Sequence, residues 1–154
     1  MDEVYRLDTR DRPGLLFAMM RALATEGGRI SLEGNLAETE VMELDGVMQD
    51  EVGALKRATL EPKLDFVIVP LVPTTVDAIE RAIRSKIAFS GYRGIIHAQI
   101  EADGKLAFAA YDNFHKDCVY AGTQVSSELL DRLIEAKVLR SYQRVHQPSV
   151  ASRI

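Results

Sequence analysis

The sequence has little cysteine and no long apolar run. Its 154 residues include one cysteine, Cys118, which excludes an intramolecular disulfide and any zinc site built from several cysteines. The longest apolar runs, such as 66–69, are far shorter than the roughly 20 residues that span a bilayer. The first residues lack the basic-then-apolar order of a signal peptide. We therefore expect a soluble, cytoplasmic protein with no membrane partner.

The sequence also lacks a dense basic cluster. It carries 19 Lys and Arg against 23 Asp and Glu, a net charge of −4, whereas nucleic-acid affinity comes mostly from Lys and Arg that neutralise phosphates. We therefore expect no nucleic-acid partner. The acidic residues do cluster, because residues 30–55 contain no Lys or Arg. The acids in this stretch are Glu33, Glu38, Glu40, Glu43, Asp45, Asp50 and Glu51.

The acidic stretch is typical of a solvated, exposed segment. A surface for a basic protein partner is the alternative interpretation. Its acids do not follow the glycine-punctuated spacing of a calcium loop. The sequence also has no glycine-rich phosphate loop of the Walker or dinucleotide type and no nucleophile elbow, and we expect no metal and no cofactor.

What is present indicates one globular domain. Hydrophobic residues make up 47% of the chain and charged residues 27%, which is ordinary globular composition. The chain begins with a predicted strand over 4–9 that ends at the turn Asp11-Arg12-Pro13-Gly14. A helix follows, with Asp11 as its cap, and Gly27-Gly28 ends it. Its apolar stripe is Leu16, Met19, Met20 and Leu23.

Alternation over 30–36 then predicts a half-buried strand. The next segment, 37–64, has no clear period. Asp45-Gly46 is a favoured two-residue turn and predicts a hairpin over 41–49, followed by a short helix near 50–58. The apolar residues between positions 41 and 55 also fit a helical period, but Gly46 and Gly53 argue against one long helix.

The second half alternates strands and helices. A β-branched strand over 65–72 precedes a helix with the apolar stripe Val76, Ile79, Ile83 and Ile87. Thr74 and Asp77 form a plausible capping pair for this helix. After a loop over 91–94, the turn Asp103-Gly104 joins two strands over 94–102 and 105–112.

The chain ends with a strand over 118–121, a third helix and an edge strand over 138–145. Ser126 is expected to cap this helix. We expect four of its residues to face inward: Leu129, Leu130, Leu133 and Ile134. The polar residues 147–154 are predicted to be a frayed tail.

Without the 37–64 insertion, the first six elements follow the order βαββαβ. This order predicts an α+β fold of the ferredoxin-like plan, an antiparallel sheet with its helices on one face. We expect an ACT-like core over 1–102 with the insertion at about 37–64, and a strand–strand–helix extension of the same domain over 103–146. Two helices cover one face only, so the other face should be solvated, covered by the extension, or buried against a second subunit.

The term ACT-like rests on the turn Asp11-Arg12-Pro13-Gly14-Leu15-Leu16 between the first strand and the first helix. This turn resembles the characteristic turn of ACT domains, and Arg29-Ile30 opens the second strand at the usual distance. ACT domains are small ligand-sensing modules common in amino-acid metabolism and its regulators. The resemblance implies a non-enzymatic regulatory module that binds an amino acid or a similar small carboxylate, with no catalytic residue.

The physical chemistry of the turn agrees with such a site. Gly14 lacks a Cβ and permits close approach, and amides at a helix N-terminus favour a carboxylate. Alternatively, Asp11 only caps the helix and Gly14 only allows tight packing. The resemblance implies a ligand between paired modules, and hence a homodimer. The implied ligand-binding residues are Thr9, Asp11, Arg12, Gly14, Leu15, Arg29 and Ile30.

This chain departs from the family in two ways. Arg29 stands where many amino-acid-binding members have Asn, and a guanidinium suits a carboxylate-rich ligand or an outward salt bridge. The connection between the second and third strands is also longer than the family's usual hairpin.

An enzyme is the alternative function. Asp112, His115 and Cys118 are spaced three apart, and a cysteine thiolate next to a histidine is a nucleophile. The competing interpretation is a polar loop followed by a buried cysteine that opens a strand.

Overall fold

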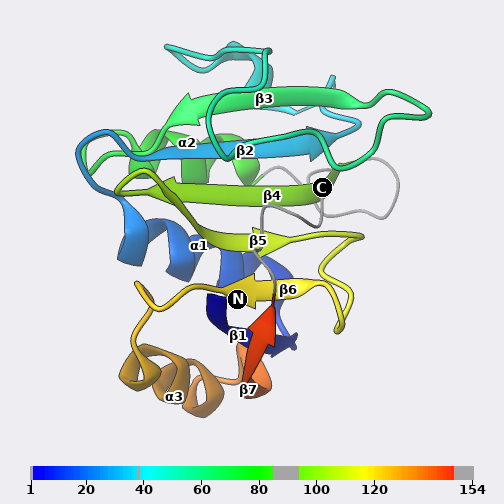
Figure 1. The fold of residues 1–154 in the computed structure, drawn as a ribbon. Coiled ribbons are helices and arrows are strands. Elements are labelled where there is room, and N and C mark those ends of the chain that lie inside the picture. Colours follow the sequence, from blue (N-terminus) through cyan, green and yellow to red (C-terminus); the bar gives the residue numbers. More distant parts are fainter. Residues whose placement is uncertain (1, 38, 85–93, 148–154) are drawn as a thin grey trace.

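Within the described residues of the computed structural model, a seven-stranded antiparallel sheet with three α-helices forms an α+β fold (Figure 1). The structure describes residues 2–37, 39–84 and 94–147, and the strand order is β3-β2-β4-β5-β6-β1-β7. The elements are β1 Asp2–Thr9, α1 Arg12–Leu23, β2 Arg29–Gly34, the 3-10 helix η1 Glu40–Glu43, β3 Asp65–Pro70, α2 Val76–Ile83, β4 Ile95–Ala102, β5 Lys105–Ala110, β6 Val119–Ala121, α3 Ser127–Glu135 and β7 Leu139–Gln147.

The main core lies between the sheet and the helices. Alternation along β2 directs Ile30 and Leu32 to this side, and α1 and α2 lie behind the sheet in Figure 1. Apolar residues surround most of the circumference of α1, as expected for a helix that is largely buried. The buried residues of α1 are Leu15, Leu16, Phe17, Met19, Met20 and Leu23.

The four strands of the predicted βαββαβ unit are not contiguous. β1 pairs with β6 and β7, whereas β2 pairs with β3 and β4, so β4, β5 and β6 lie between β1 and β2. The connection through α1, which lies behind the sheet (Figure 1), therefore passes three strands between β1 and β2.

Several local predictions are confirmed. Asp103 and Gly104 have φ values of 55° and 75°, as a two-residue hairpin turn requires. Ser126 caps α3, because its Oγ accepts the Leu129 N–H at 3.2 Å. β7 is an edge strand, as predicted.

Two predictions about the helices are wrong. Thr75, not Thr74, precedes α2, and its side chain makes no cap hydrogen bond. Its hydroxyl instead bonds the Pro70 carbonyl oxygen at 2.7 Å and anchors the preceding turn. Ile134 is not inward-facing but 36% exposed, while Leu130 and Leu133 are buried. The predicted Ile87, the loop residues 91–93 and the tail 148–154 lie outside the described residues.

The insertion between β2 and β3 contains neither the predicted hairpin nor the predicted helix. The chain forms η1 and then approaches the outer edge of β3, where Met48 and Ile68 exchange two backbone hydrogen bonds of 2.9 and 2.8 Å. Leu55 is fully buried against Phe66 and Ile68 on the sheet face opposite the helices, which we call the outer face. Packing against this face, which local sequence does not reveal, determines the path of the insertion.

A row of polar side chains on the outer face binds the backbone of the insertion. Glu33, Gln99 and Glu101 are each less than 4% exposed, and with His97 we call them the polar row. Their oxygens accept N–H groups of the insertion, which would otherwise lose their hydrogen bonds on burial. The bonds run from Ala54 to Glu101 at 2.9 Å, from Lys56 to Gln99 at 3.1 Å, and from Ala58 and Thr59 to Glu33 at 2.7 and 3.1 Å.

The expectation of an exposed acidic segment is therefore wrong for Glu33. Burial raises the pKa of Glu33, and the N–H groups of Ala58 and Thr59, together with the charge of Arg57, lower it in part. The ionised form of Glu33 suits this position, because its two carboxylate oxygens accept the two N–H groups at once. Five other acids of the segment are exposed as predicted, and Glu38 lies outside the described residues. The five are Glu40, Glu43, Asp45, Asp50 and Glu51.

His97 completes the row in a neutral state with a defined tautomer. The backbone N–H of Asp112 can only donate, so Nδ1 of His97, 3.0 Å away, must be unprotonated. Nε2 then carries the proton and donates to Thr59 Oγ1 at 2.7 Å. Burial lowers the pKa of His97, while the charge of Asp112 acts in the opposite sense.

Acid should weaken the fold through His97. Because its pKa is lowered in the folded protein, the unfolded chain takes up the proton first. The free energy of unfolding should therefore fall as the pH drops from the usual value of 6.5 through the lowered pKa. Glu33 acts in the opposite sense: its pKa is raised, so its protonation favours the folded state as the pH falls toward 4.5.

Urea denaturation across this pH range separates the two groups. His97→Gln cannot titrate, so we expect it to be less stable than the wild type at neutral pH but to lose less stability on acidification. Parallel curves for the two proteins would contradict this assignment.

Candidate functional site

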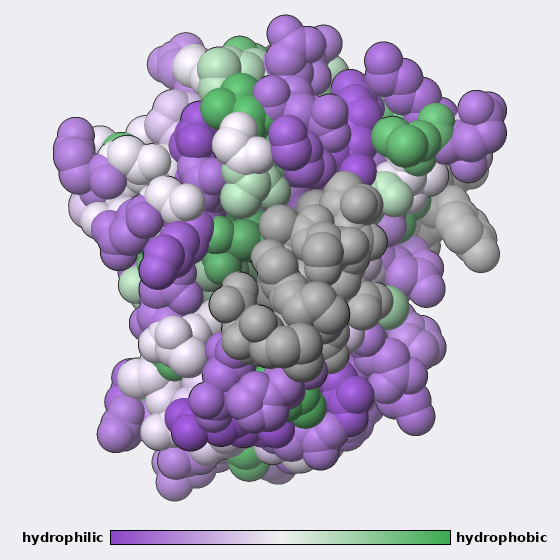
Figure 2. All heavy atoms as spheres, viewed as in Figure 1, coloured by the Kyte–Doolittle hydropathy of each residue, from purple (hydrophilic) through white to green (hydrophobic). Residues whose placement is uncertain are grey.

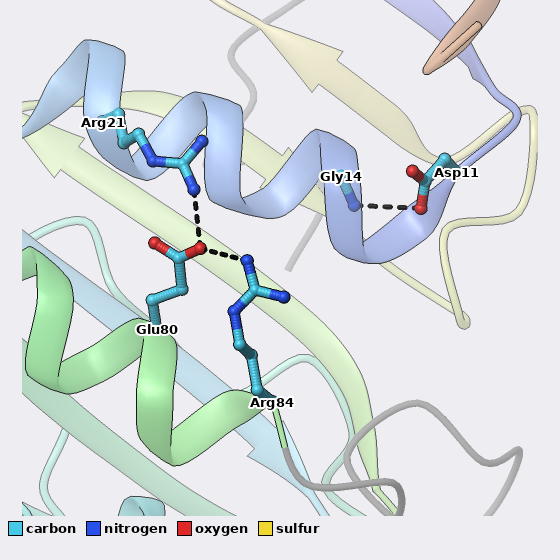
Figure 3. A network of polar contacts seen from close by, with 5 residues as sticks. All are labelled: Asp11, Gly14, Arg21, Glu80 and Arg84. Atoms are coloured by element: carbon cyan, nitrogen blue, oxygen red, sulfur yellow. Dashed lines mark hydrogen bonds and ion pairs between the residues drawn. The ribbon is translucent and has the colours of Figure 1, made fainter.

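The N–H groups of the turn before α1 are hydrogen-bonded within the turn itself. Oδ1 of Asp11 accepts the Gly14 N–H at 3.0 Å (Figure 3), and the Leu15 N–H bonds the Asp11 carbonyl oxygen at 2.9 Å. A Cβ on Gly14 would lie 2.4 Å from Oδ2 of Asp11. The glycine therefore lets the carboxylate fold back as a cap, and this geometry supports the capping interpretation of the turn.

The other predicted ligand-binding residues are scattered. Leu15 and Ile30 are fully buried in the core, and the Arg29 guanidinium forms an ion pair with Glu101. Arg12 is half-buried. The Thr9 hydroxyl is buried with no hydrogen-bond partner among the described residues. Three strands separate Arg29 and Ile30 from the turn, so one chain does not bring the two halves of the predicted site together.

The predicted enzyme residues lie in a tight loop after β5. Three consecutive residues, Asp112, Asn113 and Phe114, have φ values between 54° and 62°. The exposed His115 ring accepts the Asp117 N–H at 3.3 Å through Nδ1. Cys118 is half-buried beside the apolar cluster of the outer face. Within the described residues, no three of the potential metal-ligating side chains gather in one place.

A charged contact joins α1 and α2 on the helical side. Oε1 of Glu80 lies 2.6 Å from Arg21 and 2.5 Å from Arg84 (Figure 3). The Arg84 guanidinium also lies over the Phe17 ring, 4.8 Å from its centroid. Both arginines are thus engaged within the chain, and we assign this cluster a role in packing the two helices.

A polar pocket lies on the outer face near β1 and β7. It has a volume of about 250 Å³ and is bounded by residues of β1, of the loop before β6 and of β7. We call it the Arg6 pocket. Its lining residues are Arg6, Leu7, Asp8, Lys116, Asp117, Ser141, Tyr142 and Gln143.

Arg6 is the residue that distinguishes this pocket. It alternates with the core residues Tyr5 and Leu7 along β1, so its side chain projects from the outer face. Arg6 is half-buried, yet within residues 2–37, 39–84 and 94–147 its guanidinium has no hydrogen bond or ion pair. Asp8 does not neutralise it, because its Oδ1 pairs with Arg140 at 3.3 Å.

A second cavity of about 280 Å³ lies where the insertion meets β3. Its half-buried cation, Arg57, donates to the Leu64 carbonyl oxygen at 2.7 Å and lies over the Phe66 ring at 4.9 Å. Because this guanidinium is already bonded, the second cavity is a weaker candidate than the Arg6 pocket.

Sequence reasoning missed the Arg6 pocket. Its residues come from three parts of the chain that strand pairing brings together, with Arg6 opposite Gln143 in the β1–β7 ladder. The available signal was a charged residue in the middle of a strand, and alternation alone assigns such a residue to solvent.

Comparison of the chain with protein-family models, with curated proteins and with solved structures gives no match. The resemblance to ACT domains therefore stays a prediction. Among the described residues, no helix has the length and apolar character needed to cross a membrane. Hydrophilic side chains predominate on the face seen in Figure 2.

The cap geometry makes a testable prediction about Asp11 and Gly14. Asp11→Ala should lower the free energy of unfolding by about 1 kcal/mol, the usual value of an N-cap. Gly14→Ala should cost a similar amount, since its Cβ would displace the Asp11 carboxylate. The double variant should cost no more than Asp11→Ala alone, because both changes remove the same interaction.

Urea denaturation of the four proteins measures this coupling. Strictly additive losses would mean that Gly14 serves some purpose other than accommodating the cap.

Proposed function

We propose that the protein is a non-enzymatic module that binds a small carboxylate, such as an amino acid, in the Arg6 pocket. The observation that carries this proposal is the half-buried Arg6 guanidinium without a partner among the described residues. A charged group that loses water without gaining a partner costs free energy. A bound carboxylate supplies that partner through charge-assisted, two-point hydrogen bonds.

The remaining lining residues favour a ligand with both charges. Lys116 adds a second cation, and the exposed Asp117 carboxylate can accept an ammonium group. Ser141 and Gln143 offer hydroxyl and amide groups at the same rim. A pocket of about 250 Å³ is smaller than the roughly 300–1,000 Å³ typical of sites for larger organic ligands, which suits a molecule of amino-acid size.

This proposal keeps the predicted ligand class but changes its place. The turn at Asp11 and Gly14 supports a relation to ACT domains, while its amides are used by the cap and by the first helical bond. The strand order also differs from a contiguous ferredoxin-like sheet. We therefore place the ligand at the sheet end near β1 and β7 rather than at the helix N-terminus.

Arg6→Gln tests the proposal directly. We expect it to weaken binding about 10- to 100-fold, the effect of losing a hydrogen bond to a charged group worth roughly 1.5–3 kcal/mol. Calorimetry with the protein amino acids and with small mono- and dicarboxylates identifies the ligand on the wild-type protein. Arg81→Gln is the matched control, since it removes the same charge from an exposed position on α2.

A second variant distinguishes the ligand classes. Asp117→Asn should weaken binding of amino acids and leave binding of simple carboxylates unchanged or stronger. Absence of binding by every probe, or equal loss in Arg6→Gln and Arg81→Gln, would overturn the proposed site.

A further inference from the structure

The two edges of the sheet differ in whether another segment pairs with the outer strand. At the β3 edge, Met48 of the insertion occupies the outer side of the strand through its two hydrogen bonds with Ile68. At the opposite edge, β7 pairs with β1 on one side, and no strand of the described residues pairs with its other side. Open edges of this kind bind further strands unless the chain protects them.

The charges on β7 do not protect it. Charged side chains normally discourage edge-to-edge association, but both arginines of β7 are engaged by its neighbour β1. Arg144 lies 2.8 Å from Glu3 and over the Tyr5 ring, and Arg140 pairs with Asp8 and the Thr9 carbonyl oxygen. β7 contains no proline, and its ladder with β1 is regular from Ser141 to Gln147 and shifts register only next to Arg140. The free backbone groups of residues 141–147 are therefore available for pairing.

We propose that β7 is the surface through which two copies of this chain associate, by antiparallel pairing of β7 with β7 about a twofold axis at Gln143. Gln143 is the middle residue of the strand. Along an edge strand, the N–H and C=O groups of every second residue point toward the free side. In antiparallel pairing of β7 with a second β7, these residues must lie opposite one another, so even-numbered residues face even-numbered ones and odd-numbered residues face odd-numbered ones. Pairing centred on Gln143 meets this requirement and aligns residues 141–145 of both copies, a stretch that lies within the regular part of the β1–β7 ladder.

Side-chain chemistry favours this register. It places Tyr142 opposite Arg144 of the partner subunit, on the helical side of the sheet. Although Arg144 pairs with Glu3 of its own chain, 61% of its side chain is exposed. Tyr142 packs edge-on against Tyr5, and its hydroxyl donates to the Asp131 carboxylate of α3 at 2.7 Å. Glu128 adds a further negative charge near Tyr142, so the edge of each copy offers an aromatic ring and carboxylates to an incoming guanidinium.

Cysteine cross-linking tests the register. In a Cys118→Ser background, Gln143→Cys places two thiols at the axis with Cα atoms about 5 Å apart, within the range for a disulfide. Ser141→Cys is the matched control, because its two copies would be offset by four residues, or about 14 Å along the strands. We expect a cross-linked dimer from Gln143→Cys, none from Ser141→Cys, and one again when Ser141→Cys is combined with Val145→Cys.

Sedimentation of the wild-type chain tests association itself. We expect a species of twice 17.1 kDa, and a shift to monomer in Gln143→Lys, which places two like charges face to face, with unchanged circular dichroism. A wild-type protein that is monomeric at all concentrations, or equal cross-linking of Gln143→Cys and Ser141→Cys, would overturn the proposal.

The Arg6 variant separates this inference from the proposed function. Arg6→Gln should weaken ligand binding about 10- to 100-fold and leave the dimer intact, since Arg6 lies on β1 and β7 separates β1 from the free edge. Gln143 also lines the Arg6 pocket, so its variants are used only to measure association, and ligand binding is tested with Arg6→Gln.

Discussion

The structure depends on hydrogen-bond acceptors that the outer face of the sheet provides for the insertion. A connection between strands that lies over a sheet face must find partners for its backbone N–H groups, because water is excluded there. In this protein Glu33, Gln99 and Glu101 supply them from β2 and β4. Without these side chains the N–H groups of the insertion would be buried and unsatisfied, and the outer face beneath Leu55 would lose its cover.

Using carboxylates for this purpose has an electrostatic cost that the structure offsets locally. Glu101 is neutralised by Arg29, and the charge of Arg57 acts on Glu33. His97 contributes as a neutral ring, with one nitrogen accepting and the other donating. The row is thus satisfied in one protonation state, so that the attachment of the insertion and the stability of the fold respond to pH together.

The sequence predicts what is encoded within a few residues and fails where distant segments meet. The Asp103-Gly104 turn and the Ser126 cap are local, so their residues suffice to identify them. The contact between Glu33 and Ala58 joins positions that no local period relates. Alternation places Glu33 and Arg6 on the same outer face. It does not predict that the insertion covers Glu33 while Arg6 lines an open pocket. Strand order is equally non-local, because β5 and β6 enter the sheet between β4 and β1.

The contrast among the half-buried arginines carries the functional argument furthest. The described residues contain four of them: Arg6, Arg12, Arg29 and Arg57. Arg29 pairs with Glu101, Arg57 donates to a carbonyl oxygen, and Arg12 also has a partner. Within the described residues, each half-buried arginine except Arg6 therefore has a partner. Because the same fold satisfies the others, the exception at a polar pocket is the observation behind our proposal that Arg6 takes a partner from outside the chain.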